Sequence, residues 1–115
     1  MKITRIDSNA RMSKIVVHGE TVYLCGQTDG SVDKDISEQT IECLEKVSTL
    51  LDQAGSSVNK ILSVTVYIKD MKEFEKMNRV WDSWFENKPK PARACVQAMM
   101  ARDIILVEMS VIAAL

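Results

Sequence analysis

Residues 60–70 read KILSVTVYIKD and alternate apolar and polar side chains with a period of two. The two sets are Leu62, Val64, Val66 and Ile68 on one face, and Ser63, Thr65 and Tyr67 on the other. Such alternation predicts a β-strand with one apolar face. A sheet built around this strand has one face to bury against helices and a second, more polar face.

Helices are predicted on both sides of this strand in the chain. Asp35 and Glu38 form a capping-box signature, apolar residues then recur at helical spacing, and Gly55 stops the run, which predicts a helix over residues 36–54. The same signature at Asp70 and Glu73 opens a second helix that ends before Pro89. The apolar positions of the second helix are Phe74, Met77, Trp81 and Phe85.

The remaining segments are predicted to form four strands and one loop. Residues 14–18 and 21–25 read as a hairpin turning at Gly19, residues 27–35 read as a loop, and two strands close the chain at about 92–99 and 104–114. The order is β-β-α-β-α-β-β. We expect one α+β domain over residues 1–115, with both helices packed on one face of a single mixed sheet.

Composition restricts the function. The chain has 15 basic and 16 acidic residues and a net charge of −1, so the basic patch of a nucleic-acid-binding protein is not expected. No signal peptide or apolar span is seen, which predicts a cytoplasmic location. The cysteines Cys25, Cys43 and Cys95 have no paired spacing and His18 is the only histidine, so we expect neither disulfide, metal nor cofactor.

Two charged side chains lie in predicted strands whose other residues are mostly apolar. Arg93 follows Pro91 in KPKPARACVQAM, and Glu108 interrupts IILVEMSVIAAL. A carboxylate removed from water needs a cation or donors, so the pair is either a buried ion pair or part of a functional site. We expect both on the polar sheet face, together with Cys95, Gln97 and Ser110, where they would form a polar pocket in a homo-oligomer interface.

Two further residues allow two interpretations each. Asn78 lies on the oily stripe of the second helix, where it is either a helix-to-loop tether or a pocket residue. Gly26 either serves a turn or lets a ligand approach the backbone. No nucleotide or nucleophile motif is present. The residues alone therefore predict a cofactor-free pocket for a small carboxylic acid, with hydrolysis as a hypothesis.

Five segments together resemble the RidA/YjgF family of reactive-imine deaminases across essentially the whole chain. They are YLCGQ, VTVYIKDM, FEKMNRVWDSWF, PARACV and LVEMSVIAA, with a glutamate fifteen residues after the arginine. The resemblance implies a chorismate-mutase-like homotrimer with three sites at the subunit interfaces. It also implies hydrolysis of enamines and imines, such as 2-aminoacrylate or 2-iminobutanoate, to 2-oxo acids and ammonia.

The resemblance also implies residue roles. Arg93 would hold the substrate carboxylate, Glu108 would position the attacking water, and the Cys95 backbone would help to hold that water. The pocket would be lined by Gly26, Asn78 and Cys25. One departure is RMSK at residues 11–14, where Met12 replaces the tyrosine of a G-P-Y-S-like segment, as in one branch of the family. A non-catalytic carboxylate binder is the alternative, and a ribonuclease or translation inhibitor is a third interpretation, which the net charge disfavours.

Overall fold

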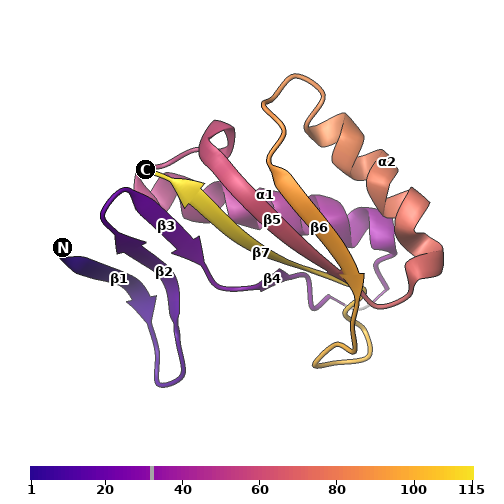
Figure 1. The fold of residues 1–115 in the computed structure, drawn as a ribbon. Helices are drawn as coiled ribbons and strands as arrows, with labels where there is room; N and C mark the ends of the chain where they lie inside the picture. Colours follow the sequence, from indigo (N-terminus) through magenta and orange to yellow (C-terminus); the bar gives the residue numbers. More distant parts are fainter. Residues whose placement is uncertain (32) are drawn as a thin grey trace.

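The computed structural model describes residues 1–31 and 33–115 and forms one seven-stranded sheet with two helices. The strands are β1 Ile3–Ser8, β2 Ser13–His18, β3 Thr21–Leu24, β4 Gln27–Thr28, β5 Ile61–Ile68, β6 Ala92–Gln97 and β7 Val107–Ala114. Their order across the sheet is β1-β2-β3-β7-β5-β6, and β4 pairs with β7. Both helices lie on the same face of the sheet, as predicted (Figure 1).

Helix α1, Ile36–Ala54, has the predicted bounds. Its first turn is closed by the predicted capping box, in which the Glu38 amide donates to Asp35 Oδ1 at 2.9 Å and the Asp35 amide donates to Glu38 Oε1 at 3.2 Å. The helix ends at Gly55, whose φ of 84° is accessible to glycine without strain. Local sequence alone therefore sets both ends of α1.

Helix α2, Phe74–Trp84, begins later than the sequence predicted. Asp70 accepts a hydrogen bond from the Lys72 amide at 3.0 Å and caps a short 3-10 turn, η2 Met71–Glu73, that precedes the helix. The capping box predicted for α2 is therefore wrong. A second 3-10 turn, η1 Val58–Lys60, leads into β5.

The core lies between the helices and the inner face of β5 and β7. Val64, Val66 and Ile68 are buried there, as the alternation predicted. Leu62 is an exception, because a register shift between Ile61 and Ser63 leaves Leu62 52% exposed and buries Ile61 instead. A bulge changes which side chains face inward, and the period of two cannot show it.

The β2–β3 hairpin is confirmed, with Gly19 at a φ of 60° in its turn. Two strands were missed. β1 is mostly exposed at the sheet edge, and β4 is a two-residue strand inside the predicted loop 27–35. Val32, which belongs to that predicted loop, lies outside the described residues. No helix among the described residues is long and apolar enough to cross a membrane.

One connection positions the candidate site. β5 and β6 are parallel and β6 ends the strand order, so the chain crosses over through α2 between them. This crossover lays α2 along the inner face of β6 (Figure 1).

Candidate functional site

The predicted site residues do not share one face of the sheet. Arg93 pairs with Val64, and Cys95 with Val66, so their side chains point toward the helices. Glu108 pairs with Tyr67 and points to the open face. The expectation that Arg93, Cys95 and Gln97 lie on the polar face is therefore wrong, whereas Ser63, Thr65, Tyr67, Glu108 and Ser110 lie there as predicted.

Arg93, Asn78 and Cys95 form what we call the arginine cluster, at the edge of the sheet beside α2. Arg93 Nη1 donates to Asn78 Oδ1 at 2.8 Å. The guanidinium carbon lies 4.9 Å from the centre of the Trp81 ring and 5.9 Å from that of Phe74, within the range of cation–π attraction. Asn78 is thus a partner of Arg93 rather than a tether to a loop.

The guanidinium of Arg93 retains unused donors. An arginine has five N–H donors, and the hydrogen bond to Asn78 uses one of them. No ion pair of Arg93 occurs among residues 1–31 and 33–115. A half-buried, positioned guanidinium of this kind matches the fork geometry of a carboxylate.

Cys95 contributes no thiolate to this cluster. Partial burial raises the pKa of the Cys95 thiol, and the charge of Arg93 offsets part of that rise. The thiol therefore stays protonated near neutral pH and is a poor nucleophile. Only the Cys95 backbone, on the edge strand β6, remains as a candidate to contact a bound ligand or water.

Glu108, Gly26 and Cys25 form what we call the glutamate cluster, where β4 meets β7. A Cβ atom at Gly26 would collide with the Glu108 carboxylate, so the absence of a side chain at Gly26 makes room for that group. Within the described part of the chain, the Glu108 carboxylate forms no ion pair. Its charge is therefore available to a ligand.

A hollow of about 330 Å³ lies over Glu108 on the open face. Gly26, Tyr67 and Ser110 line it together with Met99 and Met100 from the β6–β7 connection. Cys25 lines a separate hollow of about 400 Å³ next to Lys14 and Lys46, and its thiol accepts a hydrogen bond from Gln27 Nε2 at 3.2 Å. Cys25 is therefore adjacent to the Glu108 hollow without lining it.

Sequence reasoning missed three contributors to these clusters. Trp81 was assigned only to the core, although its ring also faces Arg93. The sequence pattern favours core positions for the methionines, whereas Met99 and Met100, which follow the strand of Arg93, line the hollow over Glu108. No group of three or more potential metal ligands was found within the described ranges.

Comparison with known proteins defines the class. The family model described as Endoribonuclease L-PSP matches residues 2–115. The RutC family protein YoaB of Escherichia coli is 36% identical over 114 residues, which cover 99% of both chains. The chain therefore belongs to the RidA/YjgF family, in which such relatives are named RutC family proteins and whose members include imine deaminases.

Solved structures agree with this assignment. A member of the YjgF protein family from Neisseria meningitidis has a TM-score of 0.93 at 32% identity, covering 99% of this chain and 95% of the other. A crystal structure from Salmonella typhimurium, described as a putative translation initiation inhibitor, has a TM-score of 0.87 at 32% identity and covers 98% and 97%. The α+β fold with two helices on one face of a mixed sheet is that of the family.

Proposed function

We propose that this protein is a deaminase that hydrolyses reactive enamines and imines, such as 2-aminoacrylate and 2-iminobutanoate, to 2-oxo acids and ammonia. The observation that carries the proposal is Arg93. Its guanidinium is held by Asn78 and two aromatic rings, and it has free donors and no carboxylate partner among the described residues. The natural occupant of such a position is a substrate carboxylate.

Glu108 supplies the proton chemistry in this proposal. Its carboxylate accepts a proton from a water molecule as the water oxygen attacks the imine carbon, with help from the Cys95 backbone. That proton moves to the nitrogen to give a carbinolamine. The hydroxyl proton then passes through Glu108 to the nitrogen, the carbon–nitrogen bond breaks as the carbonyl forms, and ammonia leaves with the 2-oxo acid. Because imines already hydrolyse in water, positioning and proton transfer are the main tasks left to the protein.

The proposed site needs two subunits. The arginine cluster faces the helices and the glutamate cluster faces away from them, so one chain cannot place both against a single small substrate. We therefore propose a homotrimer in which the arginine cluster of one subunit meets the glutamate cluster of its neighbour. Exposed apolar side chains on the open face, Tyr23 and Val96, support burial of this face by association.

The deaminase proposal is tested by generating 2-iminobutanoate in situ and timing the release of ammonia. We expect acceleration over buffer, and we expect Arg93→Ala to abolish it. Arg79→Ala, which changes an exposed arginine of α2 on the helix side of the sheet, is the matched control and retains the activity. No acceleration by the wild-type protein, or full activity in Arg93→Ala, overturns the proposal. Light scattering that gives a monomer mass at micromolar concentration overturns the trimer.

A non-catalytic carboxylate binder is the second candidate. Met12, 49% exposed in the β1–β2 turn, offers no aromatic ring at the position that the family resemblance assigns to tyrosine. A binder would be stabilised by 2-oxobutanoate in thermal denaturation and would release no ammonia from the imine.

Ribonuclease activity receives little support. The matching family model carries the name of an endoribonuclease, and the Salmonella relative is described in terms of translation inhibition. The net charge of −1 provides no general attraction for RNA. RNA cleavage that survives stringent purification and disappears in Arg93→Ala would favour this function.

A further inference from the structure

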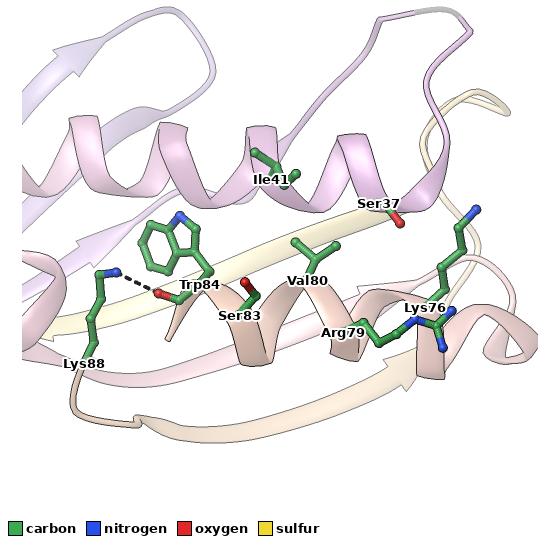
Figure 2. Close-up of a pocket in the computed structure, with 8 residues that line it drawn as sticks. All are labelled: Ser37, Ile41, Lys76, Arg79, Val80, Ser83, Trp84 and Lys88. Carbon is green, nitrogen blue, oxygen red and sulfur yellow. Dashed lines mark hydrogen bonds between the residues drawn. The ribbon is translucent and has the colours of Figure 1, made fainter. Parts of the chain in front are cut away.

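A groove between α1 and α2 forms a third hollow, which is larger than the two described above and lies apart from both clusters (Figure 2). It has a volume of about 630 Å³ and is lined by eight residues, none of which belongs to the arginine or the glutamate cluster. Its size is within the range of small-molecule sites. The groove therefore has room for a ligand that the proposed deaminase reaction does not use.

The middle of the groove is apolar. Ile41 from α1 faces Val80 and Trp84 from α2 across it (Figure 2). Ile41 is 41% exposed, which is unusual for a large aliphatic side chain on a helix that packs against a sheet. Trp84 packs edge-on against Phe85 with ring centres 5.0 Å apart, so the indole is held in place. These side chains provide a preformed surface for an apolar ligand body.

The ends of the groove are cationic. Lys76 and Arg79 lie toward one end and Lys88 toward the other (Figure 2), and the eight described lining residues include no acidic one. Lys76 Nζ is already 3.2 Å from Asp35 Oδ2, and Lys88 Nζ donates to the Trp84 carbonyl at 2.7 Å. Arg79 has no ion pair within the described part of the chain. Lys88 has no ion pair there either, but its ammonium already contacts the Trp84 carbonyl and ring, so Arg79 is the cation of the groove whose donors are free for an anion.

We infer that this groove binds a small amphipathic carboxylate, with its apolar body on Ile41, Val80 and Trp84 and its carboxylate on Arg79. The apolar middle and uncompensated cation match both parts of such a ligand. Single-stranded RNA fits less well, because Trp84 is the one aromatic side chain among the eight described lining residues, so successive bases have no second ring on which to stack. This site is independent of the proposed deaminase site.

Decanoate is a suitable probe, because it combines an unbranched apolar chain with one carboxylate. Titration calorimetry, with tryptophan fluorescence as a second readout of Trp84, is expected to show saturable binding of one decanoate per chain. Decanol, which lacks the charge, should bind more weakly. Arg79→Gln should weaken decanoate binding by about fivefold, the upper end of what an exposed charge pair contributes.

Ile41→Glu should weaken binding by about tenfold or more, because it removes apolar surface and places a negative charge in the groove. The matched controls are Arg5→Gln and Ile3→Glu, which change exposed residues of β1 and should leave the affinity unchanged. Circular dichroism confirms that each variant is folded. The inference is overturned by the absence of saturable binding below the critical micelle concentration, by equal affinity for decanol, by unchanged affinity in both groove variants, or by poly(U) binding in place of decanoate.

Discussion

Arg93 and Glu108 occupy opposite faces of the same sheet and are held in different ways. On the helix side, the Arg93 guanidinium is fixed by a hydrogen bond to Asn78 and by the rings of Phe74 and Trp81. On the open face, Glu108 is given room by Gly26 and lies under a hollow. A binding group benefits from being fixed, whereas a group that moves protons benefits from open access.

The same comparison bears on assembly. The helix side is closed by α1 and α2 within one chain, whereas the open face carries exposed Tyr23 and Val96 and the half-buried polar side chains of β5 and β7. If the two clusters act together, they do so between subunits. Variants on each face reveal how far the two clusters depend on each other.

Mixing two inactive variants gives the largest effect. Arg93→Ala and Glu108→Gln should each lower deaminase activity by roughly 100- to 10,000-fold, because each removes one cluster's main group. In a cyclic trimer assembled at random from equal amounts of both, about one quarter of the interfaces join two intact clusters. Unfolding and refolding the mixture should therefore recover about one quarter of the wild-type activity. No recovery from refolded trimers would mean that both groups act from the same subunit.

Gly26→Ala tests the glutamate cluster. The new Cβ collides with the Glu108 carboxylate and displaces it, so kcat should fall by about 100-fold while the fold is retained. Gly30→Ala is the matched control, since a Cβ there meets the exposed end of Arg102 instead. Steady-state kinetics on both variants check the prediction. Equal losses in both would point to a general effect on the backbone.

Asn78→Ala tests how Arg93 is positioned. Loss of a hydrogen bond to a charged group should lower kcat/KM by about tenfold, mainly through a higher KM. Asn78→Asp keeps an acceptor but should not restore the affinity, because its carboxylate would pair with Arg93 and repel the substrate carboxylate. Asn87→Ala changes an exposed asparagine after α2 and serves as the control. An unchanged KM in Asn78→Ala would show that the aromatic rings alone position Arg93.

The smallest expected effect is on stability, and it comes from Cys43, which is buried on the helix side of the sheet. Burial raises the pKa of the Cys43 thiol to about 12 from its ordinary value of 9.0. The unfolded chain therefore loses this proton first, so the contribution of the neutral thiol to stability is complete below pH 9 and declines as the pH rises toward 12. In a Cys25→Ser, Cys95→Ser background, Cys43 should not react with a thiol reagent at pH 8 until denaturant is added. Rapid reaction of the native protein would contradict the burial.

Prediction from sequence succeeded where interactions between neighbouring residues determine the local structure. Helix α1 was placed correctly because its capping box and its terminal glycine both act within one turn. The inner face of β5 was correct from Val64 onward and wrong at Leu62, where a bulge changes the register. β1 was missed because only its pairing with β2 makes a mostly exposed segment a strand.

The candidate residues stand out in the sequence as polar groups in apolar strands, but their arrangement was predicted wrongly. The sequence predicts Arg93, Cys95 and Gln97 on the polar face of the sheet, and the structure turns these three side chains toward the helices. Periodicity shows which side chains share a face and is silent on which face meets the helices.

By itself, then, the amino-acid sequence determined helix α1, most of the strands, the family, and the presence of a cation and a carboxylate in otherwise apolar strands. These follow from interactions over a few residues and from residue types. Only the tertiary structure decided that Arg93 meets Asn78 and Trp81 on the helix side while Glu108 opens to the other face. That outcome depends on the α2 crossover and on strand register, which are set by packing between distant segments of the chain.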